Sequence, residues 1–177
     1  VRYWNSPAPN EATCRALRDP VIVLPLAATE QHGPHLPLST DVDIGLGILN
    51  ETFLRLDRSI PAWTLPIETV GASLEHVRYD GITGVTPNEL VQTIFNHGER
   101  LSTLGIRRLV ISNSHGGNSA PIESAALRLR EECELLVVKA NYYRFERPVD
   151  IDLPEIEWRH GLHGGAVSQV ARHDLDP

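Results

Sequence analysis

Short apolar runs alternate with helical patterns along the chain, and this alternation constrains the fold more than any other sequence feature. Four runs are apolar and strand-like, at residues 21–26, 60–67, 107–112 and 135–140. Amphipathic helical patterns separate them, at residues 44–56, 86–104 and 119–133. Because strands and helices alternate, the sequence predicts an α/β fold: a mostly parallel sheet flanked by helices in three α/β/α layers.

Local signals refine these boundaries. Thr86 is a favourable N-cap, with Pro87 at the first helical position and Glu89 completing a capping box. Residues 71–86 are rich in Gly, Ser and Thr and predict a long irregular loop of the kind that often carries function. A weaker helical pattern covers residues 11–18, and residues 148–154 fit an acidic connecting loop.

Size and composition narrow the class of protein. With 177 residues, of which 41% are hydrophobic, residues 1–177 can bury one sizeable core, so we expect a single domain. The net charge of -7 without a basic cluster argues against nucleic acid as a partner. No apolar run approaches the roughly 18 residues of a membrane span, so no membrane partner is expected. Cys14 and Cys133 form neither a metal-binding spacing nor a disulfide framework, which favours the cytoplasm.

Potential metal ligands gather just after the first predicted strand, where Glu30, His32, His35 and Asp41 follow one another. Ligands of open parallel sheets bind beyond the carboxyl ends of the strands. Carboxylate and imidazole together are typical ligands of Zn, Mn or Fe. The alternative interpretation is that Glu30 and His32 are polar loop residues that cap the following turn.

A second polar cluster, residues 113–118, follows the strand at residues 107–112. In the structural interpretation, Gly116 and Gly117 allow a tight turn and His115 only packs. In the functional interpretation, His115 binds metal while the two glycine amides face negative charge that develops on a substrate oxygen.

Taken together, four segments in order resemble the creatininase family of amidohydrolases. They read Pro-Leu-Ala-Ala-Thr-Glu-Gln-His-Gly-Pro-His-Leu-Pro-Leu at residues 25–38 with Thr40-Asp41, Gly-Ala-Ser-Leu-Glu-His at 71–76, Asn-Ser-His-Gly-Gly-Asn at 113–118, and His-Gly-Gly at 163–165. The resemblance implies a layered α/β fold, assembly into homo-oligomers, commonly hexamers, and one or two divalent ions (Zn, Mn or Fe) in each subunit. It also implies roles for individual residues: metal ligands Glu30, His32, Asp41 and His115; proton transfer by His163; substrate contacts from Ser73, Glu75, Gly116 and Gly117.

Two departures from the family pattern concern the fifth metal ligand. Creatininase has a second glutamate two residues after the histidine that matches His115, where this chain has Gly117. Other members supply a glutamate after the later His-Ala-Gly motif, where this chain has Ala166 and Ser168. Three alternatives remain open: one ion, a second ion held by water or Glu75, or loss of activity. The family also continues beyond this point, so the domain is expected to lack part of the family C-terminus.

The resemblance implies a metal-dependent hydrolase that cleaves the C-N bond of a small cyclic or linear amide, of the creatininase or formamide hydrolase type. Its metal polarises the amide carbonyl and supplies hydroxide near neutral pH, while His163 protonates the departing nitrogen. Other relatives cut a small precursor peptide. The alternative function is an inactive binding or assembly protein. A nucleotide-binding protein is disfavoured because no phosphate-binding glycine motif follows the first strand.

Overall fold

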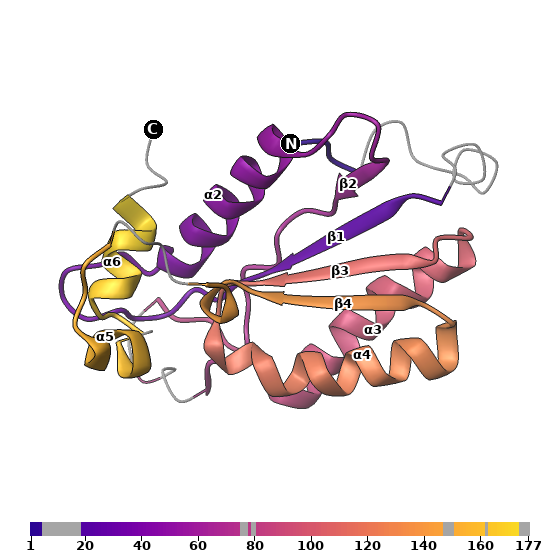
Figure 1. The fold of residues 1–177 in the computed structure, drawn as a ribbon. Coiled ribbons are helices and arrows are strands. Elements are labelled where there is room, and N and C mark those ends of the chain that lie inside the picture. Colours follow the sequence, from indigo (N-terminus) through magenta and orange to yellow (C-terminus); the bar gives the residue numbers. More distant parts are fainter. Residues whose placement is uncertain (5–18, 75–77, 79–80, 147–150, 162, 174–177) are drawn as a thin grey trace.

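A single four-stranded parallel sheet forms the centre of the molecule (Figure 1). The structure is a computed structural model, and it describes residues 1–4, 19–74, 78, 81–146, 151–161 and 163–173. The strand order is β2-β1-β3-β4, and every neighbouring pair is parallel. The strands are β1 (Val21–Leu26), β2 (Ala62–Thr64), β3 (Arg108–Asn113) and β4 (Leu136–Asn141).

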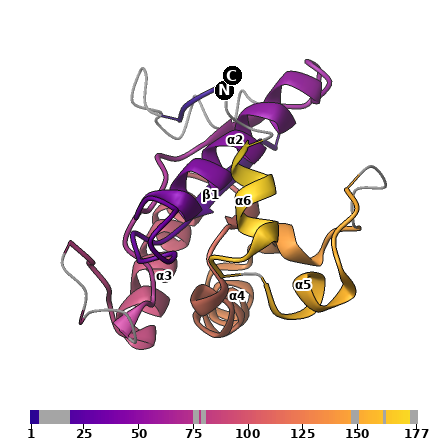
Figure 2. The same ribbon diagram turned by 90° about the vertical axis from the view of Figure 1, so that its left-hand side faces the viewer.

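Helices cover both faces of this sheet, as the sequence predicts. The long helices are α2 (Thr40–Arg55), α3 (Pro87–Thr103) and α4 (Ser119–Cys133). Helix α2 lies on one face and α3 and α4 lie on the other (Figure 1). Two short helices, α5 (Glu155–His160) and α6 (Ala166–His173), lie near the carboxyl ends of the strands, where α6 packs beside α2 (Figure 2). The α/β/α fold class is therefore confirmed.

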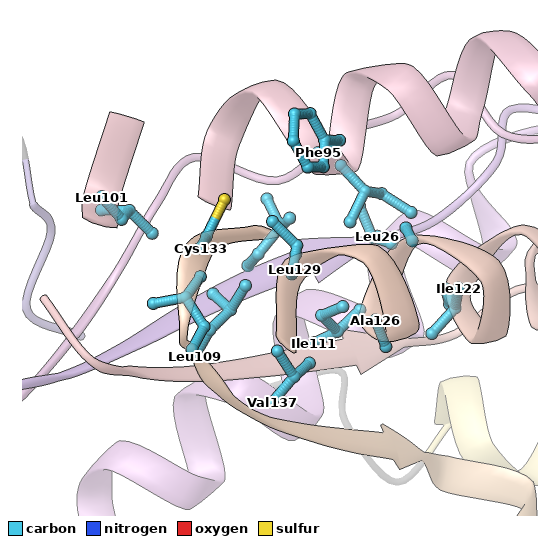
Figure 3. Close-up of a cluster of buried hydrophobic side chains, with 14 of the residues drawn as sticks. Leu26, Phe95, Leu101, Leu109, Ile111, Ile122, Ala126, Leu129, Cys133 and Val137 are labelled. Carbon is cyan, nitrogen blue, oxygen red and sulfur yellow. The ribbon is translucent and has the colours of Figure 1, made fainter. Parts of the chain in front are cut away.

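The main hydrophobic core lies between the sheet and the pair α3 and α4 (Figure 3). Alternate residues of β3, Leu109 and Ile111, point into it and are almost fully buried, as expected for a strand with one face on the core. Helices α3 and α4 approach closely at Gly98, where an added Cβ would lie 2.4 Å from a Leu129 methyl group. Burial of each such aliphatic side chain contributes about 1.5–3 kcal/mol, so this layer stabilises the sheet.

The observed elements differ from the predicted ones in three places. Strand β2 is shorter than the predicted run 60–67 because Pro61 and Pro66 flank it and cannot donate ladder hydrogen bonds. The sequence analysis does not predict α5 and α6, which have only six and eight residues. Helix α2 begins at Thr40, earlier than the apolar pattern indicates, so Asp41 lies in its first turn.

Other predictions agree with the structure or lie outside it. Helix α3 has the predicted capping box, in which Thr86 Oγ1 accepts from the amide of Glu89 at 3.2 Å. The predicted helical segment at residues 11–18, together with Glu75, lies outside the described residues. Within the part of the chain that the structure describes, no helix has both the length and the apolar character needed to cross a membrane.

Candidate metal centre

The candidate site lies where β1, β3 and β4 end together. Leu26, Asn113 and Asn141 are the last residues of these strands and are paired in register. The loop after β1 therefore leaves the sheet beside the turn after β3. The hydroxyl of Ser114 joins the two, donating to the carbonyl of Leu26 at 3.2 Å. Figure 2 looks onto these strand ends, with α6 in front of the sheet.

Asp41 links the two predicted histidine ligands. Its Oδ1 lies 3.1 Å from Nε2 of His32, and its Oδ2 lies 3.0 Å from Nδ1 of His115. The three side chains are buried. Because each carboxylate oxygen faces a different imidazole, Asp41 has the geometry of a ligand that can bridge two neighbouring cation positions.

Glu30 lies at the centre of the cluster and is completely buried, with 0% of its surface exposed. Its Oε1 lies 2.9 Å from Nδ1 of His115 and 3.3 Å from Nδ1 of His163. Burial raises the pKa of a carboxyl group, but the hydrogen bonds and charges of His115 and His163 outweigh it and hold the pKa of Glu30 well below its usual range. Glu30 is therefore a carboxylate in the folded protein.

Backbone carbonyl groups fix the orientation of both buried imidazoles. Nδ1 of His32 lies 3.1 Å from the carbonyl oxygen of Glu30, and Nε2 of His115 lies 3.2 Å from that of Ala72. Since a carbonyl oxygen can only accept, these nitrogens carry the protons. The opposite nitrogens, Nε2 of His32 and Nδ1 of His115, face the carboxylates. This outer support is typical of histidines that bind metal.

The charge of His115 indicates that the cluster is suited to hold a cation. Burial lowers the pKa of an imidazole, but the hydrogen bonds and negative charges of Asp41 and Glu30 outweigh it and raise the pKa of His115 to about 10. A proton on His115 thus compensates two buried carboxylates. Glu30, Asp41 and His115 bring ligand atoms within 4.8 Å of one another, so a divalent cation fits the same place.

Gly117 and Ser73 lie on the far side of the His115 ring. Ser73 is completely buried, and its hydroxyl lies 3.3 Å from Nε2 of His115. A Cβ at Gly117 would lie 2.4 Å from the carbonyl oxygen of Ala72 and 2.5 Å from Nε2 of His115. The turn therefore has no room for a side chain at this position. At Gly116, by contrast, an added Cβ would meet nothing within 4 Å.

His163 enters the site from the segment between α5 and α6. Its Nε2 donates to the carbonyl of Gln31 at 2.8 Å, and its ring stacks on His32 with 4.4 Å between centroids. The hydrogen bond to Glu30 is the main reason why the pKa of His163 is raised. Gly164 follows with φ +66°, and a Cβ there would lie 3.2 Å from the backbone of His32. Glycine thus allows the two segments to approach this closely.

Sequence reasoning missed part of the support for this site. The side-chain amide of Asn113 donates to the carbonyl of His115 at 2.7 Å and to Oδ1 of Asn141 at 2.9 Å. Asn118 donates to Oδ1 of Asn113 at 3.2 Å. This buried network holds the turn that carries His115. The register of parallel strands could have identified Asn141, which ends β4 directly beside Asn113.

The predicted residues thus divide into three groups. Glu30, His32, Asp41, His115 and His163 come together in one cluster. Gly116 and Gly117 form the exposed start of the turn before α4, close to that cluster, and His35 is exposed. Glu75 lies outside the described residues.

An α/β sheet with a buried carboxylate and histidine cluster at its strand ends defines an α/β protein with a candidate transition-metal centre. A family model described as creatininase, creatinine amidohydrolase, matches residues 8–169. The chain belongs to the creatininase family.

Curated relatives share part of their length with this chain. A mycofactocin precursor peptide peptidase of Mycobacterium tuberculosis (strain CDC 1551 / Oshkosh) is 39% identical over 119 residues, which are 64% of this chain and 47% of that protein. A creatinine amidohydrolase of Pseudomonas putida is 30% identical over 118 residues, 66% of this chain and 45% of that protein. The chain spans about half the length of the curated relatives it matches.

Solved structures share the fold. A mutant creatininase superposes with a TM-score of 0.70 at 25% identity, over 87% of this chain and 64% of that chain. A creatininase described with Mn superposes with a TM-score of 0.57 at 25% identity, over 75% of this chain and 54% of that chain. A third, described as a Zn-Zn type mutant, shares the fold with a TM-score of 0.68 at 24% identity, over 90% of this chain and 66% of that chain.

Proposed function

We propose that this chain forms the catalytic site of a metal-dependent hydrolase that cleaves an amide C-N bond. The observation that carries the proposal is the buried cluster of Glu30, Asp41 and His115, in which Nδ1 of His115 lies 2.9 Å from Oε1 of Glu30 and 3.0 Å from Oδ2 of Asp41. A divalent ion (Zn, Mn or Fe) would fit this donor set, and His32, whose Nε2 lies 3.1 Å from Oδ1 of Asp41, is proposed as the fourth ligand. When bound, the metal supplies Lewis acidity toward the amide carbonyl and a nucleophile at neutral pH.

The chain's own residues supply positioning and proton transfer. Ala72 and Glu30 hold the imidazoles of His115 and His32 through their backbone carbonyls, so that the metal-facing nitrogens are already oriented. His163 is half-exposed beside Glu30, with 41% of its side chain accessible. It can therefore reach both the cluster and an incoming substrate, which suits a group that gives a proton to the departing nitrogen. We propose that Gly116 and Gly117 offer their backbone amides to a substrate oxygen.

For the substrate, we propose the amide bond of a short peptide, with a small cyclic or linear amide as the second candidate. The peptide is supported by the relative at 39% identity, which is described as a precursor peptide peptidase. The small amide is supported by the relative at 30% identity, which is described as a creatinine amidohydrolase. In both cases we expect a homo-oligomer to be the working form, by family resemblance.

The experiment is an assay of the metal-loaded protein with a short peptide and with creatinine, with products identified by mass spectrometry. We expect cleavage of one of them, and loss of at least about a hundredfold in rate in His115→Ala, because this change removes a predicted metal ligand. His97→Ala is the matched control, since His97 lies away from the cluster and pairs with Glu68. Cleavage that survives unchanged in His115→Ala contradicts the proposed site. No cleavage of any amide favours the alternative, an inactive binding or assembly protein, which the missing side chain at Gly117 supports.

A further inference from the structure

Glu157 in α5 contacts both ends of the segment that carries His163. Its backbone carbonyl accepts from the amide of Gly161 at 2.7 Å, where α5 ends. Its carboxylate reaches across to α6, where Oε2 accepts from the amide of Ala166 at 3.0 Å. In the chain, His163 lies between these two amides. One residue therefore fixes where the segment leaves α5 and where it enters α6, and the two helices lie side by side (Figure 2).

The carboxylate of Glu157 acts as the N-terminal cap of α6. The first amides of a helix have no acceptor within the helix, and the residue just before the helix usually supplies a side-chain oxygen. That residue is Gly165 here, and it has no side chain. Glu157 supplies the acceptor instead, from nine positions before Ala166. A carboxylate suits this place because the N-terminus of a helix carries a partial positive charge.

Two glycines leave room for this carboxylate. An added Cβ at Gly165 would lie 2.9 Å from Oε2 of Glu157, and an added Cβ at Gly161 would overlap that oxygen. The carboxylate thus occupies the space that side chains at the two ends of the segment would fill. Because both ends of the segment meet at one residue, the segment can change its course only if Glu157 releases it.

The other side of the segment lies against the loop after β1. Nε2 of His163 donates to the carbonyl of Gln31 at 2.8 Å, and a Cβ at Gly164 would lie 3.2 Å from the backbone of His32. These contacts can form only when the segment already lies against that loop. Since 41% of the side chain of His163 is exposed, packing alone confines the imidazole little. The position of His163 therefore depends on the residue that anchors the segment, which is Glu157.

We propose that Glu157 is a positioning residue for His163. Its carboxylate caps α6, closes the segment between the two helices and so keeps the imidazole at the metal cluster. The consequence for catalysis rests on the proposed function, because it requires that His163 transfers a proton. Glu157 acts through the segment and takes no part in the proton transfer itself.

The first test follows the acylation of His163 in the full chain by diethyl pyrocarbonate, with each modified histidine quantified by mass spectrometry. In the wild-type protein both nitrogens of His163 face partners, the carbonyl of Gln31 and the carboxylate of Glu30, so the reaction should be slow. Glu157→Ala should accelerate it at least about tenfold, the factor expected for loss of a hydrogen bond to a charged group. The exposed His35 supplies the reference rate in the same sample. Equal rates at His163 in the wild type and in Glu157→Ala overturn the proposal.

Two further variants separate positioning from a general loss of stability. Glu157→Gln keeps an oxygen that can accept from the amide of Ala166, so acylation of His163 should be slower than in Glu157→Ala. A glutamine variant that reacts as fast as the alanine variant contradicts the hydrogen bond as the cause. Glu155→Ala is the matched control, because Glu155 lies two residues earlier in α5 and pairs with Arg159 at the surface. Its rate at His163 should equal that of the wild type, and a rate as high as in Glu157→Ala overturns the assignment to Glu157.

The kinetics of the metal-loaded protein test the consequence for catalysis. A misplacement of about 1 Å can cost about a hundredfold in rate. In Glu157→Ala, kcat should therefore fall by roughly ten- to a hundredfold with little change in KM, and Glu157→Gln should recover part of the loss. An unchanged kcat together with faster acylation of His163 contradicts this consequence. Acylation needs no turnover, so failure of the proposed function and failure of the positioning role give different results.

Discussion

Gly117→Ala should damage the metal site although it adds only one methyl group. The new Cβ would lie 2.5 Å from Nε2 of His115 and 2.4 Å from the carbonyl oxygen of Ala72. These two atoms form the contact that orients the imidazole, at 3.2 Å. Since no van der Waals contact is this short, the ring or the loop must shift, and the hydrogen bond between them stretches.

The magnitude follows from two effects. Overpacking a tight site costs about 1–3 kcal/mol of the free energy of unfolding. Loss of the outer hydrogen bond of a metal-binding histidine lowers metal affinity by about 10–100-fold. Gly117→Glu, which would place an acidic side chain here, should weaken metal binding as well, because its Cβ meets the same atoms.

The assay is zinc affinity by competition with a chelator, with the melting temperature measured on the same samples. Gly116→Ala is the matched control, since its Cβ meets nothing within 4 Å and it differs by one position in the same turn. Zinc affinity of Gly117→Ala equal to that of Gly116→Ala would refute the reasoning that this turn sets the orientation of His115.

Three further predictions concern stability. Asn113→Ala should lower the free energy of unfolding by roughly 2–5 kcal/mol in urea denaturation, because it leaves buried partners at His115 and Asn141 unsatisfied; an effect below about 1 kcal/mol would contradict a closed network. The metal-free protein should lose stability as the pH rises from 6.5 to about 10, because folding raises the pKa of His115. The stabilisation that the bound proton of His115 provides is therefore complete below pH 6.5 and is lost above the folded pKa. Over this pH range the melting temperature should fall less in His115→Gln than in the wild-type protein. Equal slopes in the two proteins would refute the assignment of this pH dependence to His115. Thr86→Ala should cost about 1 kcal/mol through loss of the α3 capping box, with no change in zinc affinity as the check that the loss is local.

The sequence predicted best those elements whose local sequence signal is compatible with one structure only. β-branched runs gave β1, β3 and β4 to within a residue or two, and the capping box at Thr86 gave the start of α3. The parallel order then placed both polar clusters at the same edge of the sheet. Glu30 and His115 come together because each follows the carboxyl end of a strand in this sheet. Asp41 joins them from the first turn of α2.

What the sequence could not predict depends on contacts between distant segments. Helices α5 and α6 have only six and eight residues, and the place of α6 beside α2 is set by packing between segments remote in sequence. The lack of space for a side chain at Gly117 depends on Ala72, which lies in a loop that is remote in sequence. The contact of His163 with Gln31 spans 132 positions, so no local pattern could indicate that its Nδ1 faces Glu30.

The central claim is that Glu30, His32, Asp41 and His115 hold a metal ion, and metal content after dialysis tests it most directly. The wild-type protein should retain at least one transition-metal ion for each chain by elemental analysis. Asp41→Asn should retain almost none, because it removes the carboxylate between the two histidines. Asp43→Asn, two residues further along α2, should retain the metal as the wild type does. A wild-type protein that binds no metal, or an Asp41→Asn variant that binds it fully, would contradict the account.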